Sequence, residues 1–345
     1  MRYIGSKVAT LPYLAETLRR VAPKARSVCD PFAGACSVSR YLKQRGYRLS
    51  TGDVLATSSA IQIATIAANR NPSFRRVLRC DKIKDTGEPA HIRIINYLNG
   101  LAERPGFISE QYSPAGPEGR LFFSSSNAAK IDAIRARIRD WSDNDLLSKK
   151  EEAFLLAALV TSADVVANTA GTYYAYLKEL SRKAKKPFEL RPLSLCNNHQ
   201  VNFVKRDDAI GVVSSSDDDV LYLDPPYNER DYAKYYHLPE TLVLGDEPEV
   251  IGKSGVPATR RGPVSDFCVS TKAELAFRKL IEASRAKLII VHYTPEGLIP
   301  HRAILSTLRD VGATTNRDLR VRRYSSRKGN EESSEAIHRI YICKR

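Results

Sequence analysis

The sequence lacks any run of about 18 to 20 apolar residues, the length a helix needs to cross a membrane. Its start carries no apolar stretch followed by a small-residue cleavage site, so a secretion signal is not indicated. The cysteines are few and form no C-x-x-C pair; they are Cys29, Cys36, Cys80, Cys196, Cys268 and Cys343. This spacing argues against a disulfide framework and a structural zinc site. We therefore expect a cytoplasmic protein with no membrane partner, and we assign no metal.

Acidic residues are outnumbered. The 345 residues include 54 Lys and Arg against 39 Asp and Glu, which gives a net charge of +15. Such a balance indicates a polyanionic partner, and nucleic acid fits better than a membrane because no basic amphipathic anchor is evident. The hydrophobic content of 43% is typical of a globular chain. The length suits about two domains, or one domain with a large insertion.

Two parts of the chain alternate between strands and helices. Residues 24–55 read as a strand, a turn, a helix and a second strand that ends at Asp53. The alternation of strands and helices resumes after residue 195, with a short apolar strand over 220–223 and a final antiparallel pair of strands near 319–324 and 336–342. The pattern predicts a doubly wound, mostly parallel α/β sheet with a C-terminal antiparallel hairpin.

The segment between these parts has a different pattern. Asn127 is a candidate N-cap for one helix, and Ser148 with Glu151 forms a capping box for another. A third helix is expected over 172–185. We therefore predict a catalytic domain made of 1–70 and 196–345, with 71–195 as a mostly helical inserted domain.

The strongest chemical signal is the tetrapeptide Asp224-Pro225-Pro226-Tyr227, directly after the apolar strand. Two consecutive prolines cannot lie inside a central strand, so they mark a loop at the carboxyl end of that strand, where open α/β sheets bind ligands. An Asp carboxylate and a Pro carbonyl can accept both hydrogens of an amino group, and Tyr227 offers a face for stacking. Such a site suits the exocyclic amine of a nucleobase. A rigid turn with an Asp cap is the structural alternative.

A second signal is Asp30-Pro31-Phe32-Ala33-Gly34 after the first strand. A glycine turn lets the backbone approach a cofactor, and an acid about 20 residues later, here Asp53, can hold ribose hydroxyls. A full G-x-G-x-x-G is absent, so a nucleoside cofactor without a pyrophosphate fits better than a dinucleotide.

With Tyr3, Gly5 and Lys7 near the start, the motif order resembles the Dam-like (alpha-group) DNA N6-adenine methyltransferases. The resemblance covers the chain from end to end. It implies the class I methyltransferase fold, which is Rossmann-like, with S-adenosylmethionine as cofactor and double-stranded DNA as substrate. The insertion would recognise the target site, and a cognate restriction endonuclease is left open as a partner. One departure is Cys36, which stands where the family's loop has a second glycine.

The resemblance also implies roles for individual residues. Tyr3 and Lys7 would contact S-adenosylmethionine, Phe32 and Gly34 would line its pocket, and Asp53 would hold its ribose. Asp208, with Asp207 as the rival, would meet the cofactor's adenine. The catalytic loop that would hold a flipped adenine is Asp224, Pro225, Pro226 and Tyr227, and Asp224 would also touch the cofactor.

Basic residues in the insertion give a candidate DNA surface, next to Tyr173, Tyr174 and Tyr176. Cations that neutralise phosphates and aromatic rings that stack are what base extrusion requires. A solvated helix face with tyrosines in a core is the alternative. The candidate contacts are Lys178, Arg182, Lys183, Lys185 and Lys186. A further basic stretch near the C-terminal hairpin comprises Arg317, Arg320, Arg322, Arg323, Arg327 and Lys328.

Together these features predict a site-specific DNA adenine methyltransferase. Three alternatives remain: the same fold acting on cytosine amines or RNA, a non-catalytic DNA-binding relative, and a nicotinamide oxidoreductase. The intact Asp224-Pro225-Pro226-Tyr227 loop disfavours the second, and the missing glycines disfavour the third.

Overall fold

A computed structural model describes residues 7–262, 264–322 and 335–345. By contact density the chain divides into two compact units. A sheet unit comprises Gly5–Val54, Asn197–Asp231 and Gly262–Arg345, and a helical unit includes Leu55–Cys196 and Tyr232–Arg261. Within the described ranges, no helix combines the length and the apolar character that crossing a bilayer requires.

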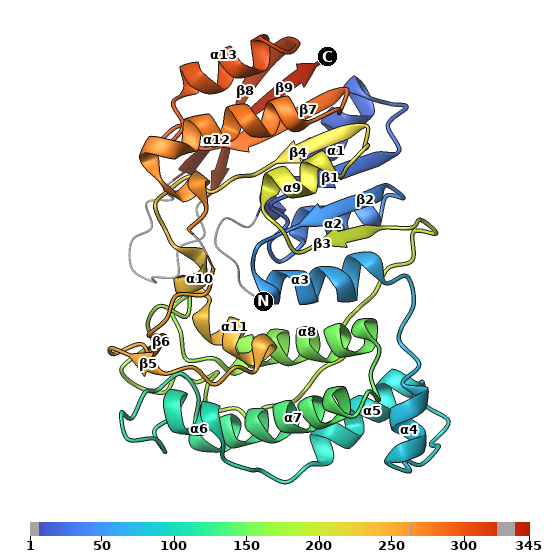
Figure 1. Cartoon of the computed structure of the whole chain (residues 1–345), viewed down its shortest axis with the longest axis vertical. Helices are drawn as coiled ribbons and strands as arrows, with labels where there is room; N and C mark the ends of the chain where they lie inside the picture. Colours follow the sequence, from blue (N-terminus) through green and yellow to red (C-terminus); the bar gives the residue numbers. More distant parts are fainter. Residues whose placement is uncertain (1–6, 263, 323–334) are drawn as a thin grey trace. The chain divides into compact units, whose positions relative to one another are not determined.

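The sheet unit is built on seven strands in the order β3-β2-β1-β4-β7-β9-β8 (Figure 1). Strands β3, β2, β1, β4 and β7 are parallel, and β9 runs antiparallel to both β7 and β8. The predicted doubly wound sheet and C-terminal hairpin are confirmed. The strands are β1 (Ser27–Asp30), β2 (Arg48–Gly52), β3 (Phe203–Lys205), β4 (Val220–Leu223), β7 (Leu288–Tyr293), β8 (Ala313–Arg322) and β9 (Glu335–Lys344).

Helices cover both faces of this sheet. The chain moves one way along the sheet from β1 to β2 and the other way from β4 to β7, so right-handed crossovers place α2 and α12 on opposite faces. The helices of this unit are η1 (Val8–Thr10), α1 (Leu11–Val21), α2 (Ser37–Lys43), α9 (Ala209–Ser214), η3 (Asp266–Cys268), α12 (Ser270–Ala283) and α13 (His301–Arg309).

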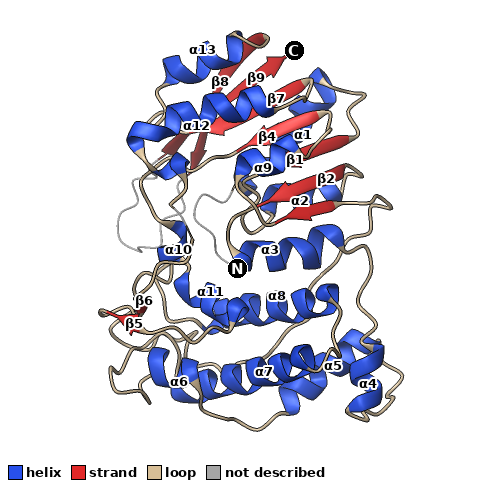
Figure 2. Ribbon diagram, in the orientation of Figure 1, coloured by secondary structure: helices blue, strands red, loops and turns tan. Residues whose placement is uncertain are grey.

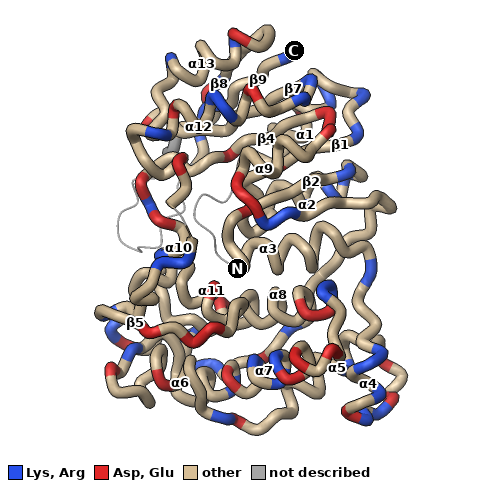
Figure 3. Tube along the Cα trace, viewed as in Figure 1, with Lys and Arg blue, Asp and Glu red and all other residues tan. Residues whose placement is uncertain are grey.

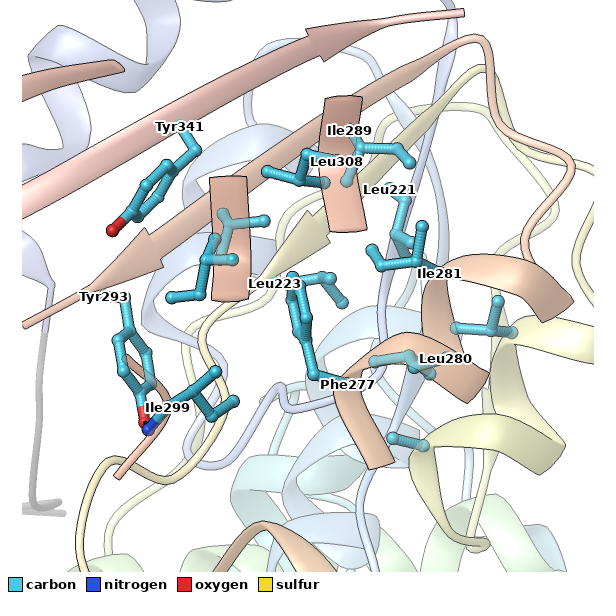
Figure 4. Packing of buried hydrophobic residues seen from close by; sticks show 14 of the residues in the cluster. Leu221, Leu223, Phe277, Leu280, Ile281, Ile289, Tyr293, Ile299, Leu308 and Tyr341 are labelled. Carbon is cyan, nitrogen blue, oxygen red and sulfur yellow. Dashed lines mark hydrogen bonds between the residues drawn. The ribbon is translucent and has the colours of Figure 1, made fainter. Parts of the chain in front are cut away.

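The main core of the sheet unit lies on the face covered by α9, α12 and α13 (Figure 4). Leu221 and Leu223 of β4 and Ile289 of β7 meet Phe277 and Ile281 of α12 there, and all five are nearly inaccessible to solvent. Short apolar strands that are buried on both faces are typical of a parallel sheet.

The helical unit contains two of the three predicted helices, α7 and α8, and several others (Figure 2). Its elements are α3 (Ala56–Gln62), the π-helical η2 (Ile63–Ala67), α4 (Arg75–Cys80), α5 (Ala90–Gly100), α6 (Phe107–Tyr112), α7 (Ser125–Asp143), α8 (Lys149–Val166), α10 (Tyr232–Tyr235), α11 (His237–Leu244), and the strand pair β5 (Val250–Ile251) and β6 (Val256–Pro257). The capping box of Ser148 and Glu151 at the start of α8 is confirmed.

This unit is larger than the insertion of 71–195 that the sequence predicts. Helix α3 packs on α8 and α11, so the unit begins at Leu55, and the segment Tyr232–Arg261 returns to join it. Backbone N–H groups of Ala56 and Thr57 at the start of α3 donate to the buried Glu240 carboxylate of α11, at 3.0 and 2.7 Å. A recognition role for the unit stays a prediction.

Two expectations in this unit are wrong, and buried asparagines explain both. The N-cap of α7 is Ser124, whose side chain accepts from the N–H of Asn127. The Asn127 amide instead donates to the carbonyls of Ala184 and Lys186. Residues 172–185 form turns and bends rather than a helix. Their backbone groups bond to side-chain amides, which compete with helix formation.

Asn168 holds most of that irregular segment. The two hydrogens of its Nδ2 are shared among three carbonyls, those of Leu121, Leu177 and Glu179, at 2.9 to 3.1 Å, and its Oδ1 accepts from the N–H of Ser181 at 2.9 Å. The residue is fully buried.

We therefore expect Asn168→Ala to lower the free energy of unfolding by about 3 kcal/mol, because several buried backbone groups lose their partner at once. Asn144→Ala is the matched control, since the exposed Asn144 amide bonds with Asp140 in its own helix turn; it should cost less than about 1 kcal/mol. Urea unfolding of both variants measures the difference. Equal losses would contradict the structural role of Asn168.

Candidate active site

Carboxylates gather at one edge of the sheet. Asp30 ends β1, Asp53 follows β2, and Asp224 follows β4. Because these strands are parallel neighbours, their carboxyl ends lie at the same edge. Strand order reverses between β1 and β4, which is where open α/β sheets form a ligand crevice.

A buried ion pair holds Asp224. The Lys7 ammonium lies 2.6 Å from Oδ1 of Asp224, and the two side chains are 5% and 20% exposed. Burial raises the pKa of Asp224, while the positive charge and hydrogen bond of Lys7 oppose that shift. The structure thus brings together the predicted cofactor residue Lys7 and the first residue of the predicted catalytic loop.

Asp30 is the most unusual acid at this edge. Its Oδ2 accepts a 2.5 Å hydrogen bond from the Ser39 hydroxyl, but its buried Oδ1 has no hydrogen-bond partner among the described residues. Burial, and to a smaller extent the negative charge of Asp224, raises the pKa of Asp30 to about 7. Asp30 therefore has a spare acceptor and titrates near neutral pH.

The loop between β1 and α2 has the turn geometry that the sequence predicts. Gly34 has φ of 50°, and its N–H donates to Oδ2 of Asp53 at 3.0 Å. Cys36 is also left-handed, with φ of 64°, and forms the N-cap of α2. The left-handed conformation explains why the family that the sequence resembles has a second glycine at the position of Cys36. Cysteine adopts it at a cost of about 1–2 kcal/mol.

Aromatic rings lie at the same edge. Phe32 packs edge-on against Phe267, with centroids 5.0 Å apart, and is partly buried. Tyr227 is also partly buried against the core, and its carbonyl accepts from the N–H of Leu298 at 3.2 Å. Pro225 is buried and Pro226 partly so. Tyr3 lies outside the described residues.

The two acids after β3 both have partners within the chain. Asp208 is the N-cap of α9, and its carboxylate accepts from the N–H of Gly211 at 2.8 Å. Asp207 pairs with Lys205 at 2.8 Å, and this interaction lowers the pKa of Asp207. A side chain at Gly211 would meet the end of the exposed Asp207 side chain, which would then have to shift. Which of the two meets a cofactor stays a prediction.

Sequence reasoning missed a polar line near Asp224, of which Tyr222 and His292 are buried and His338 is half-buried. The Tyr222 hydroxyl lies 3.3 Å from Nδ1 of His292, whose Nε2 lies 2.7 Å from Nδ1 of His338. These residues come from β4, β7 and β9. His292 follows four aliphatic residues in its strand, and that polar interruption was the available signal.

The predicted DNA-contacting residues lie on the irregular segment of the helical unit. Lys178, Arg182, Lys185 and Lys186 are exposed and Lys183 is half-buried. Among the neighbouring tyrosines, Tyr173 is buried and belongs to the core, whereas Tyr174 is 42% exposed and stacks on Tyr235. Lys and Arg occur throughout both units, mixed with acids (Figure 3), so the net charge is not confined to this segment.

The second basic stretch is described only in part. The Arg317 guanidinium lies 5.7 Å from the centre of the Tyr13 ring. Arg323, Arg327 and Lys328 lie outside the described residues.

Comparison with known proteins is consistent with this geometry. A family model described as D12 class N6 adenine-specific DNA methyltransferase matches residues 3–294.

The chain is 33% identical to the Type II methyltransferase M.FokI of Planomicrobium okeanokoites over 348 residues, which cover 100% of this chain and 53% of that protein. It is 30% identical to the modification methylase StsI of Streptococcus sanguinis, covering 99% of this chain and 51% of that protein. This chain thus spans about half the length of these two relatives. It is 32% identical to the Type II methyltransferase M.NlaIII of Neisseria lactamica, covering 87% of this chain and 85% of that protein.

The ion pair predicts a specific stability pattern. Lys7→Met leaves the Asp224 carboxylate without its ammonium partner, so we expect a loss of about 3 kcal/mol at pH 8. The loss should shrink as the pH falls, because Asp224 then takes up a proton and needs no counter-charge. The double variant Lys7→Met/Asp224→Asn should be more stable than Lys7→Met alone.

Denaturant unfolding between pH 5 and pH 8 measures this pattern. Lys205→Met is the matched control, because the pair that Lys205 forms with Asp207 is exposed; its stability should stay close to that of wild type. A pH-independent loss in Lys7→Met would rule out the buried pair as its cause.

Proposed function

Because this chain belongs to the D12 class of N6 adenine-specific DNA methyltransferases, we propose that it transfers a methyl group from S-adenosylmethionine to the exocyclic amine of adenine in double-stranded DNA. The observation that carries the proposal is the Asp224-Pro225-Pro226-Tyr227 loop. It leaves β4 at the carboxyl edge, beside the reversal of strand order, with its carboxylate held by Lys7.

The loop suits an amine that must become a nucleophile. The lone pair of the adenine amine is conjugated with the ring, so it attacks a methyl group only when the amine is oriented out of that conjugation. The Asp224 carboxylate and the Pro225 carbonyl would accept its two hydrogens, and the ring of Tyr227 would stack on the extruded base. Catalysis is then mainly positioning.

The carboxyl edge also fits the cofactor. S-adenosylmethionine supplies an electrophilic methyl group on a positively charged sulfur. The buried Oδ1 of Asp30, which has no hydrogen-bond partner among the described residues, would accept from a donor on a cationic ligand. The hydrogen bond between Gly34 and Asp53 holds the glycine turn on which a ribose would rest. Phe32 and Lys7 are the other residues at this edge that we assign to cofactor binding. The acid after β3, Asp208 or Asp207, would serve the cofactor's adenine.

We assign DNA recognition to the helical unit, with phosphate contacts from Lys178, Arg182, Lys183, Lys185 and Lys186. Two buried amides support this assignment. Asn127 and Asn168 fix the backbone of this segment at Lys186 and at Leu177 to Ser181. A backbone fixed in advance presents its cations with little ordering cost on binding.

An endonuclease that reads the same site is the functional partner we propose, because relatives include proteins named Type II methyltransferases. The alternatives of cytosine or RNA methylation are separated by one assay. Treated DNA and RNA are digested to nucleosides, and the methylated nucleoside is identified.

Asp224→Ala should lower methyl transfer at least about 10²-fold, because one positioned acceptor is lost. Asp224→Asn should lose less, since one acceptor oxygen remains. Asp217→Ala is the matched control: Asp217 precedes the same strand at its other end, is 84% exposed and pairs with Arg48. Labelled-methyl transfer to DNA measures all three, with cofactor binding checked by calorimetry. Turnover close to wild type in Asp224→Ala would remove Asp224 from catalysis.

The DNA surface is tested by salt dependence. Replacing the exposed Lys185 and Lys186 by Ala should weaken binding to target and random duplexes about equally, and should flatten the slope of log affinity against log salt by up to about 1.8. Lys149→Ala/Lys150→Ala is the matched control, because it removes the same charge from two consecutive exposed lysines elsewhere in the helical unit. If both double variants change the slope equally, the predicted segment makes no specific phosphate contacts.

A further inference from the structure

A cavity of about 460 Å³ lies at the amino ends of β1 and β2, whereas the candidate active site lies at their carboxyl ends. Three segments of the sheet unit line it: α1, the residues just before β1, and the turn between α2 and β2. The lining residues that carry a charge or an aromatic ring are Glu16, Arg19, Arg26, Arg45 and Tyr47. The volume falls within the range of about 300 to 1,000 Å³ that is typical of small-molecule sites. The proposed methyl transfer makes no use of this cavity.

The arginines of this cavity carry positive charge without a carboxylate partner. Each comes from a different segment, and in the part of the chain that the structure describes none of the three forms an ion pair. Arg26 donates to two backbone carbonyls just before β1, at 3.2 and 3.4 Å. The Arg45 guanidinium lies 3.4 Å from the centre of the Tyr41 ring. These contacts hold two of the guanidinium groups in place without neutralising them.

Three acids near the same edge are bound to other groups. Asp217 and Asp218 pair with Arg48, at 3.0 and 3.1 Å. Asp219 accepts from two backbone N–H groups at the start of β1, at 2.7 and 3.1 Å. The chain thus has carboxylates at this edge, but they bind Arg48 and the strand backbone. The charge of the cavity arginines therefore remains available to an anion from outside the chain.

Two further lining residues narrow the kind of anion. Tyr47 is half-buried; burial raises its pKa, and the positive charges of Arg26 and Arg45 oppose that rise. Both guanidinium groups therefore act on the phenol, which gives the cavity an aromatic ring beside its positive charge. Glu16 is exposed and has no ion pair within the described ranges. Such a carboxylate repels a bare polyanion but accepts hydrogen bonds from hydroxyl groups, as acids do with ribose in nucleotide sites.

The geometry points to this cavity as a binding site for a ribonucleoside phosphate, separate from the methyl-transfer site. The three arginines would bind the phosphate, because a guanidinium group matches the geometry of phosphate oxygens. Glu16 would accept from the ribose hydroxyls, and the ring of Tyr47 would contact the base. The inference goes beyond the proposed function and does not depend on it, since the two sites lie at opposite edges of the sheet.

Calorimetry on the full-length protein tests the site without any methyl transfer. The four common ribonucleoside 5′-monophosphates are titrated separately, with and without S-adenosylmethionine. At least one of them should bind wild type with a dissociation constant below about 1 mM. S-adenosylmethionine should leave that affinity unchanged. Absence of binding by all four nucleotides, or loss of binding when S-adenosylmethionine is present, would overturn the inference.

Arg19→Ala should weaken nucleotide binding about tenfold, because a charge-assisted hydrogen bond to the phosphate is lost. Arg20→Ala is the matched control. Arg20 is the next residue, is exposed in the same last turn of α1 and does not line the cavity. Both substitutions remove a positive charge from the end of that helix, so their effects on the helix itself should match. Equal affinities in the two variants would contradict the site.

A second comparison separates a nucleotide from other sources of phosphate. Wild type should bind the ribonucleotide about tenfold more tightly than its 2′,3′-dideoxy analogue, and Glu16→Ala should remove that preference. Inorganic phosphate should bind more weakly than the nucleotide. Equal affinities for inorganic phosphate and nucleotide would show a phosphate site only. Displacement of the nucleotide by a random DNA duplex, with DNA binding weakened in Arg19→Ala but not in Arg20→Ala, would make the cavity a DNA contact. Either result would overturn the inference.

Discussion

The buried ion pair between Lys7 and Asp224 is the contact on which the arrangement of the site depends. Strand topology alone brings several carboxylates to one edge, and burial there disfavours their charged forms. Lys7 supplies the opposite charge from the segment just before η1 (Val8–Thr10), at the other end of the sequence from the later strands. Without such a cation, burial would shift Asp224 toward its protonated form, which accepts fewer hydrogens from an amine.

Two further acids, Asp53 and Asp208, accept hydrogen bonds from the loops that they organise. Asp53 accepts from Gly34, and Asp208 caps α9. These contacts hold the turns in place before any ligand binds, which reduces the ordering cost of binding. A carboxylate that caps a turn can still offer its other lone pairs to a ligand, so structural and binding roles are compatible in one residue.

Much of the sheet unit could be predicted because its signals are local. The strand before Asp224, the glycine turn and the final hairpin each follow from a few adjacent residues, and the family resemblance is confirmed. The helix expected over 172–185 is absent because two buried side-chain amides bond to that backbone: Asn168, which directly precedes the segment, and Asn127, which is far from it in sequence. The line from Tyr222 to His338 was missed for a related reason: it depends on strand order and register, which no short segment reveals.

Two buried aspartates show how the site differs from ordinary structure. Asp132 of α7 is buried in the helical unit and accepts four hydrogen bonds, three from the N–H groups of Gly106, Ile108 and Ser109 and one from the Ser109 hydroxyl. Asp30 is at least as buried, yet its Oδ1 has no partner among the described residues. A chain that can satisfy one buried carboxylate so completely has no need to leave another unsatisfied for the sake of the fold. The spare acceptor of Asp30 is better explained by a donor that arrives with a ligand. In other folds too, an unsatisfied buried carboxylate indicates a functional acid, whereas burial by itself does not distinguish functional from structural acids.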